Sequence, residues 1–223
     1  MITKRDYKSI LVVPDGMADR PLAELDGQTP MQMARKPNMD FLASHGKVGM
    51  VRTIPEGMDP GSDVAVMSLL GYDPRKYYSG RAPIEATSIG IPLDSHDVAF
   101  RCNLVSCDGE TMIDYSGGHV TTEEARELIG LLNEKLGTNK ISFYPGVSYR
   151  HIMIWRNGSP DLRTVPPHNI MGKPIAEYLP EGDGDNIIRQ IMFNSFELLD
   201  QHPINRRRRE AGRQPANMAW LWG

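Results

Sequence analysis

Cysteine is scarce in this sequence, and its two cysteines form neither a metal-binding nor a redox pattern. Cys102 and Cys107 lie in one apolar stretch, five positions apart. This odd offset places them on opposite faces of a strand, so a disulfide between them is not expected. Neither belongs to a CxxC motif or to a Cys/His cluster with zinc spacing. We therefore predict two buried free thiols.

An excess of charge and long apolar runs are also missing. The 25 basic and 28 acidic side chains give a net charge of −3, so no overall basic field favours nucleic acid or anionic lipid. No apolar run approaches membrane-spanning length, and the first residues lack a secretory pattern. We therefore predict a cytoplasmic globular protein without a nucleic-acid or membrane partner. Glycine and proline, at 21 and 17 residues, indicate many turns.

The first 80 residues have the pattern of an α/β fold. A continuous apolar run over 8–13 is typical of a strand buried on both faces, and it ends just before Asp15. Helices are predicted from 30 and 37, each with proline at its first position, and a second strand over 48–54. We expect part of a doubly wound sheet. Asp15, at a strand end, is then a candidate metal ligand, and an Asp-Gly turn is the alternative.

The stretch 60–71 reads Pro-Gly-Ser-Asp-Val-Ala-Val-Met-Ser-Leu-Leu-Gly and predicts a short helix. Ser62 is placed at its N-cap, and Gly71 is placed as the left-handed residue at its end. The first turn of a helix offers unpaired N–H groups and a partial positive charge, both of which suit a phosphate. Ser62 is therefore a candidate phosphate-carrying nucleophile. The alternative is that its hydroxyl only caps the helix.

Residues 73–94 are rich in glycine, proline, tyrosine and serine, and this composition predicts a loop that crosses between domains. From about 90 to 205 the pattern predicts an inserted α+β domain. The expected strands are 98–106, 111–115, 141–144 and 150–155, and the expected helices are 122–136 and 185–201.

The last residues, 206–223, are predicted as a linker that returns toward another part of the protein. The arginine run 206–209 is expected to be a solvated helix end. The sequence finishes on Trp220, Leu221 and Trp222, whereas a terminus is ordinarily polar. Residues 1–72 also supply too few strands for a sheet layer. We expect either a partner or a longer polypeptide of which this is the front half.

Seven short blocks, spread over nearly the whole chain, resemble a known family. They are 12–19, 55–57 with 60–65, 70–74, 80–86, 100–104, 149–151 and 166–168. Together they are similar to the archaeal-type 2,3-bisphosphoglycerate-independent phosphoglycerate mutases, which belong to the alkaline phosphatase superfamily. The resemblance implies an amino-terminal half: residues 1–80 begin a metal-dependent phosphatase-like domain, 90–205 form an inserted substrate-binding domain, and 206–223 lead toward a missing carboxyl-terminal half.

The resemblance also implies the chemistry. It implies interconversion of 2- and 3-phosphoglycerate through a phosphoserine at Ser62, with two divalent metal ions (manganese, magnesium or zinc) and without 2,3-bisphosphoglycerate as a cofactor. Asp15 and Ser62 match metal-binding positions, and the other metal ligands are expected in the missing half. The substrate-binding residues implied are Arg81, Asn103, His119, Arg150 and His151.

These residue types suit the implied substrate. Guanidinium forks grip carboxylate and phosphate groups, and a loop histidine can carry a proton to a hydroxyl. Asn169 stands where the family usually has aspartate, so a charge-based role at that position is in doubt. Two alternative functions stay open: phosphoryl transfer to another small molecule, as in a proposed homoserine kinase branch, and a non-catalytic module that binds phosphorylated acids.

Overall fold

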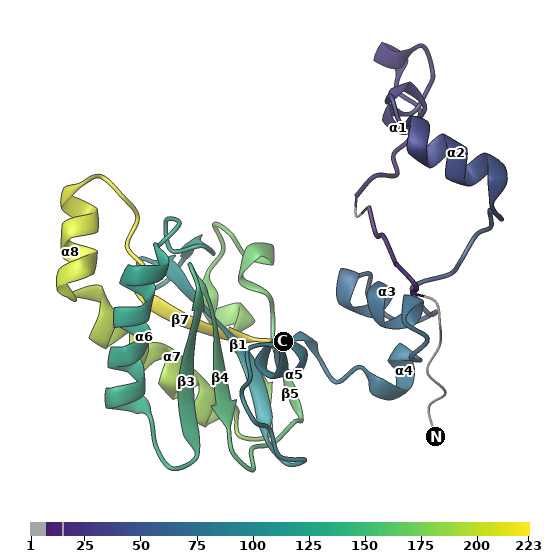
Figure 1. Cartoon of the computed structure of the whole chain (residues 1–223). Coiled ribbons are helices and arrows are strands. Elements are labelled where there is room, and N and C mark those ends of the chain that lie inside the picture. The colour runs from purple at the N-terminus through teal and green to yellow at the C-terminus, as the bar shows by residue number, and fades with distance from the viewer. Residues whose placement is uncertain (1–7, 15) are drawn as a thin grey trace. The chain divides into compact units, whose positions relative to one another are not determined.

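The computed structural model describes residues 8–14 and 16–223 (Figure 1). The chain divides into two compact units, Met1–Tyr78 and Ser79–Gly223. The boundary lies inside the segment 73–94 that was predicted as a crossing loop. That segment contains two short helices, α4 (Pro74–Tyr77) and α5 (Arg81–Ser88), so the prediction of a loop is wrong. Within the described residues no helix is both long and apolar enough to cross a membrane.

The first unit is built from helices over its described residues. They are η1 (Ala23–Leu25), α1 (Pro30–Met33), α2 (Pro37–His45), α3 (Ser62–Leu69) and α4. The predicted starts of α1 and α2 are confirmed, because proline supplies the first helical residue of each, where its missing N–H costs nothing. A capping box at α1 adds to this, with Thr29 and Gln32 each accepting the other's backbone N–H.

The two strands predicted in this unit are not formed over its described residues. Ile10 and Val12 in the first apolar run are 87% and 77% exposed, and Met50 in the second is 99% exposed. A strand buried on both faces needs neighbouring strands to pair its N–H and C=O groups and further layers to cover it. The apolar pattern marks residues that favour burial, but residues 8–14 and 16–78 supply no sheet that could bury them.

The second unit contains an antiparallel sheet centred on one long strand. Its strands are β1 (Val98–Cys107), β2 (Met112–Asp114), β3 (Ile141–Val147), β4 (Arg150–Trp155) and β7 (Met218–Trp222). Strand β1 pairs with β2, β4 and β7, and β4 pairs with β3. The four predicted strands are confirmed. A separate two-stranded sheet joins β5 (Leu162–Arg163) and β6 (Glu181–Gly182).

Helices cover both faces of the main sheet. Helices α6 (Thr122–Leu136) and α7 (Asp185–Asp200) pack on the larger core, and α5 packs on β1 and β4. Helix α7 also lies along β7, where Ser195 Oγ accepts the backbone N–H of Ala219 at 2.8 Å. The other helical segments are η2 (Pro167–Asn169), η3 (Ile175–Tyr178) and α8 (Pro203–Glu210).

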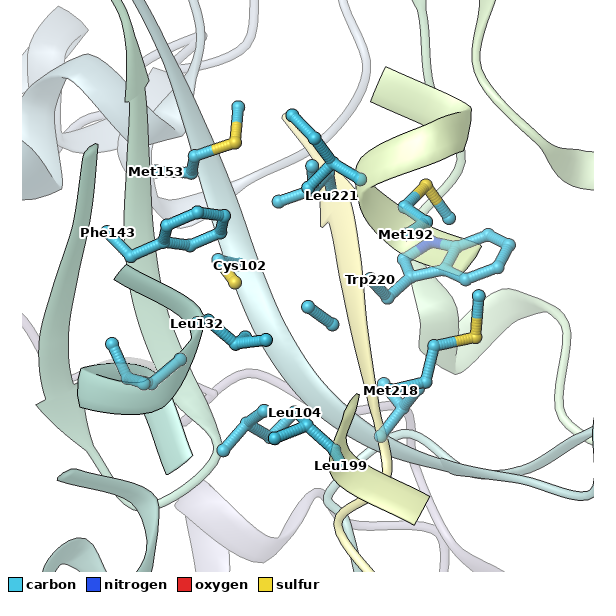
Figure 2. Close-up of a cluster of buried hydrophobic side chains, with 14 of the residues drawn as sticks. Cys102, Leu104, Leu132, Phe143, Met153, Met192, Leu199, Met218, Trp220 and Leu221 are labelled. Atoms are coloured by element: carbon cyan, nitrogen blue, oxygen red, sulfur yellow. The ribbon is translucent and has the colours of Figure 1, made fainter. Parts of the chain in front are cut away.

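The alternation of β1 divides the interior into two hydrophobic clusters. Phe100, Cys102 and Leu104 belong to the larger cluster, whereas Ala99 packs with residues of α5 and β4 in the smaller one. Figure 2 shows Cys102 and Leu104 beside Leu132, Phe143 and other side chains of the larger cluster. Both cysteines are buried and free, as predicted. The mixed α/β class is therefore confirmed, with the α+β part formed completely within the second unit.

The last residues differ from the linker that was predicted for 206–223. All five residues of β7 are buried, and the strand pairs with residues 101–105 of β1. The apolar side chains of 218–222 therefore complete a core within this chain. A local pattern could not reveal this, because the partner strand lies more than a hundred residues earlier in the sequence.

The arginine run was predicted to be solvated, and this is wrong for Arg208. Its side chain is buried and forms an ion pair with Glu124, whereas Arg206, Arg207 and Arg209 are exposed. The physical reason is helical periodicity: Arg208 lies one turn after the buried Ile204 and shares its face of α8.

Candidate active site

Ser62 is the first residue of α3, and Gly61 occupies the N-cap. The prediction of Ser62 as N-cap is therefore wrong by one residue, because Gly61 keeps extended dihedral angles while Ser62 is already helical. A Cβ atom at Gly61 would lie 2.4 Å from Asp63 Oδ1, so a larger residue there would force the Asp63 side chain to move. Gly61 makes no side-chain capping bond, and the first turn of a helix carries backbone N–H groups and a partial positive charge that suit an anion. Gly71 has φ 87°, as predicted.

Two polar side chains fix the surroundings of Ser62 within the first unit. The Tyr78 hydroxyl donates a hydrogen bond to the carboxylate of Asp63. Asp63 lies in the first turn of α3, where a negative charge is favoured by the helix dipole. The turn that carries Ser62 is thereby tied to the end of α4. The candidate metal ligand Asp15 lies outside the described residues.

The described residues do not by themselves provide a metal site. Among residues 8–14 and 16–223 no group of three or more His, Cys, Asp or Glu side chains lies close enough together to hold an ion. Hard divalent ions take about six oxygen ligands, which Ser62 alone does not offer. The two-metal site thus stays a prediction, and its remaining ligands are expected outside these residues.

In the second unit, one face of the sheet carries a cluster of cations. Asn103 on β1 is paired in register with Arg150 on β4, and Arg101 lies two residues before Asn103. Side chains two apart on a strand share a face, so Arg101, Asn103 and Arg150 lie on the same side. Arg101 Nε donates to Glu85 Oε2 of α5 at 3.0 Å. Burial lowers the pKa of Arg101, Glu85 opposes this shift, and the charges of Arg81 and Arg150 add to it.

Aromatic rings surround this cluster. The Arg101 guanidinium lies 4.4 Å from the Trp222 ring, whose Nε1 donates to Asn103 Oδ1 at 3.1 Å. The Arg150 guanidinium lies 5.7 Å from the Tyr149 ring. Further ring contacts join Tyr149, Tyr115, His168 and Trp222. Such contacts hold guanidinium groups in fixed orientations and leave part of each group available for an anion.

Arg101, Glu85 and Trp222 were not among the site residues predicted from the sequence. Arg101 could have been found from its even spacing to Asn103 on one strand. Trp222 could not, because only the pairing of β7 with β1 brings it there. A cavity of about 210 Å³ lies beside the cluster, and its wall includes Glu85, Arg150 and His151.

The two predicted histidines lie in different surroundings. His119 is exposed and follows Gly117 and Gly118 in the segment between β2 and α6. His151 is only 2% exposed, and its Nδ1 accepts the backbone N–H of Gly146 at 2.9 Å. Its Nε2 is buried and has no hydrogen-bond partner within the described residues. The structure thus places Asn103 beside Arg150 on one face of the sheet. The burial of His151 favours a structural role over direct contact with a substrate.

The buried His151 predicts a loss of stability in acid. Burial lowers its pKa to about 4, well below the value of 6.5 for an exposed histidine, because the charged form is poorly solvated. Above about pH 6.5 His151 is neutral in both the folded and the unfolded protein, so its full contribution to stability is present there. It is lost as the pH falls toward 4, because only the unfolded chain binds the proton. The expected loss is about 3 kcal/mol.

The measurement is denaturant unfolding between pH 7 and 4 for the wild type and His151→Asn. Asparagine keeps an acceptor for Gly146 but cannot titrate, so its unfolding free energy should fall less steeply with decreasing pH. Identical slopes for the two proteins would contradict the assignment.

The chain is similar to proteins of one known family. A family model described as 2,3-bisphosphoglycerate-independent phosphoglycerate mutase matches residues 43–205. The chain is 52% identical over 216 residues to the protein of that name from Methanothrix thermoacetophila and 51% identical over 217 residues to that from Methanosarcina barkeri. Each match covers 97% of this chain and 54% of the relative. The chain thus spans about half the length of the curated relatives it matches.

Two solved structures also match this chain. A cofactor-independent phosphoglycerate mutase from Thermoplasma acidophilum matches with a TM-score of 0.56 and 30% identity, over 93% of this chain and 57% of that one. A protein from Pyrococcus horikoshii matches with a TM-score of 0.68 and 29% identity, over 94% of this chain and 49% of that one.

Proposed function

Because the chain belongs to the 2,3-bisphosphoglycerate-independent phosphoglycerate mutase family, we propose that it forms the amino-terminal half of a cytoplasmic enzyme that interconverts 2- and 3-phosphoglycerate. The observation that carries the proposal is the family match over 43–205. That range includes Ser62 and the five predicted substrate-binding residues, Arg81, Asn103, His119, Arg150 and His151.

In the proposed reaction Ser62 carries the phosphoryl group between the two hydroxyl positions of glycerate. Its Oγ attacks phosphorus, the bond from phosphorus to the substrate oxygen breaks, and that oxygen takes up a proton. The other glycerate hydroxyl then attacks the phosphoserine and regenerates Ser62, so 2,3-bisphosphoglycerate is not required. The position of Ser62 in the first turn of α3 supports this role, because the N–H donors and the dipole there favour phosphate oxygens.

The cation cluster of the second unit is proposed to hold the acid during the exchange. Together with Arg81, which begins α5, Asn103 and Arg150 of this cluster are proposed to bind a carboxylate and a phosphate, and both anions suit guanidinium forks. Two divalent ions of the manganese, magnesium or zinc class are part of the proposal, with Asp15 and Ser62 among their ligands. Such ions neutralise phosphoryl oxygens and lower the pKa of a coordinated hydroxyl.

The test is a coupled assay of the full-length protein that contains this chain. The protein is supplied with 3-phosphoglycerate and manganese, without 2,3-bisphosphoglycerate, and 2-phosphoglycerate is expected to form. Absence of the product would overturn the proposal. A parallel reaction with homoserine and ATP tests the kinase alternative, and phosphohomoserine as the only product would favour it instead.

A substitution in the cation cluster gives a second prediction. Arg150→Met in the full-length enzyme removes the guanidinium but keeps an unbranched side chain of related length. We expect KM for phosphoglycerate to rise about tenfold or more, since a hydrogen bond to a charged group contributes about 1.5–3 kcal/mol. Arg126→Met, an exposed position on α6, is the matched control. Equal KM values for the two variants would show that Arg150 does not bind the substrate.

A further inference from the structure

The segment between β2 and α6 has an unusual backbone. Gly117, Gly118 and His119 follow one another with φ angles of 57°, 61° and 51°. Glycine adopts this left-handed conformation readily, but for other residue types it costs roughly 1 kcal/mol or more. His119 therefore keeps its backbone angles only because surrounding groups hold the segment, and the question is which groups do so.

One side of the segment is held by Asp114 and Ser116. The Asp114 carboxylate accepts the backbone N–H groups of Ser116 at 2.9 Å and Gly118 at 2.8 Å. The Ser116 hydroxyl donates to the same carboxylate and accepts the backbone N–H of His119 at 3.2 Å. The N–H groups on both sides of Gly117 are thereby satisfied from within the segment.

The other side is held by Arg208, which comes from α8 at a distance of about ninety residues in sequence. Its Nη2 donates to the carbonyl oxygens of Gly117 at 3.0 Å and Gly118 at 2.7 Å. Its Nε donates to the Gln214 carbonyl at 2.9 Å. Arg208 is only 3% exposed. If its guanidinium were removed, water could not reach these carbonyl groups to replace the lost hydrogen bonds.

Arg208 also holds the chain after His119. Its Nη1 donates to Glu124 Oε2 at 2.7 Å, and the same oxygen accepts the backbone N–H of Thr121 in the capping box of α6. One planar guanidinium therefore contacts the residues directly before His119 and, through Glu124, those directly after it. The packing leaves little room, because a Cβ atom at Gly118 would lie 2.6 Å from the Gln214 carbonyl oxygen.

We propose that Arg208 is a positioning residue that fixes the backbone of Gly117–His119 and thereby the direction in which His119 is presented. Arg208 is buried, and its hydrogen bonds go to groups of the protein itself. The consequence for catalysis rests on the proposed function, in which His119 contacts phosphoglycerate. The consequence for the loop does not, because it follows from the hydrogen bonds of Arg208 alone.

The loop is tested by hydrogen exchange in the full-length protein, on peptides that cover residues 114–121. Arg208→Lys keeps a positive charge but cannot reproduce the planar fork. We expect exchange in these peptides to accelerate about tenfold or more, with exchange in β1 and β4 unchanged. Arg207→Lys, at an exposed position on the same helix, is the matched control. Equal exchange in the two variants would overturn the proposal.

The link to His119 is tested by a double-mutant cycle on mutase activity. We expect Arg208→Lys to lower kcat/KM about tenfold to a hundredfold in the wild type, as misplacement of a reacting group does. In a His119→Gln background it should have little further effect, because the residue being positioned is gone. Effects that multiply would show a general structural role and refute positioning.

Two safeguards keep these outcomes separate. If Arg208→Lys does not fold, Glu124→Gln removes the ion pair yet keeps an acceptor for Thr121, and it should accelerate exchange in the same peptides. Unchanged exchange in Glu124→Gln would then count against the proposal. If the wild type shows no mutase activity, the proposed function fails, whereas the exchange measurements still decide whether Arg208 fixes the loop.

Discussion

Ser62→Ala in the full-length enzyme is expected to abolish the phosphoenzyme and to lower kcat by roughly four orders of magnitude or more, as the loss of a nucleophile does elsewhere. Alanine removes the only atom of residue 62 that can form an ester with the phosphoryl group. The helix should persist, because Ser62 is its first residue and Gly61 is the N-cap. The measurements are mass spectrometry of the enzyme after incubation with 3-phosphoglycerate, and turnover in the coupled assay.

Ser68→Ala is the matched control for this prediction. It changes the same residue type in the last turn of α3, away from the first-turn N–H groups. It should retain activity and form phosphoenzyme at Ser62. A phosphorylated peptide covering residue 62 in the Ser62→Ala protein, or full turnover by that protein, would refute the assignment of Ser62 as nucleophile.

Trp220→Ala is expected to cause the largest loss of stability. Trp220 is fully buried in β7, and its Nε1 donates to the Val165 carbonyl at 2.8 Å. Removing a buried tryptophan costs about 3–5 kcal/mol through lost contacts and the cavity that remains. The part-buried Val165 carbonyl loses its donor, which adds up to roughly 1–3 kcal/mol. Denaturant unfolding, followed by circular dichroism so that the lost fluorophore does not matter, measures the change.

Trp220→Phe separates the two contributions. Phenylalanine keeps most of the apolar volume but has no N–H group for Val165, so the loss should be clearly smaller than for alanine. If Trp220→Ala lowered the free energy of unfolding by less than 1 kcal/mol, β7 would not be a core strand in solution. That outcome would restore the interpretation of 206–223 as a linker.

Helices and strands of the second unit were predictable where the sequence pattern that marks them lies within a few residues. The capping box of Thr121 and Glu124 marks the start of α6, and the apolar stripe that follows gives its buried face. The turn at Asp108 and Gly109 likewise indicates the pairing of β1 with β2. In the first unit, local sequence patterns correctly predicted the starts of α1 and α2. They also predicted two strands that the described residues do not form. The difference is that a helix satisfies its own backbone, whereas a strand depends on neighbours.

The residues of the candidate site also divide into those that the sequence predicted and those that it did not. Ser62 and Arg150 were predicted from blocks of local sequence and from family resemblance. The partners of these residues were not, because Arg101, Glu85 and Trp222 meet only through strand register and the packing of α5. His151 was predicted as a substrate-binding residue from the family resemblance, and only the structure shows that it is 2% exposed.

The sequence by itself determined the mixed α/β class, strands β1 to β4, helices α6 and α7, the buried thiols and the family resemblance. These depend on periodicity, capping and residue type, which act over a few positions. Only the tertiary structure decided that 218–222 form a buried strand paired with β1, that Arg208 is buried, and that Arg101 lies near Arg150. Those outcomes depend on contacts between distant segments, and the free energy of such contacts is set by which surfaces are buried together.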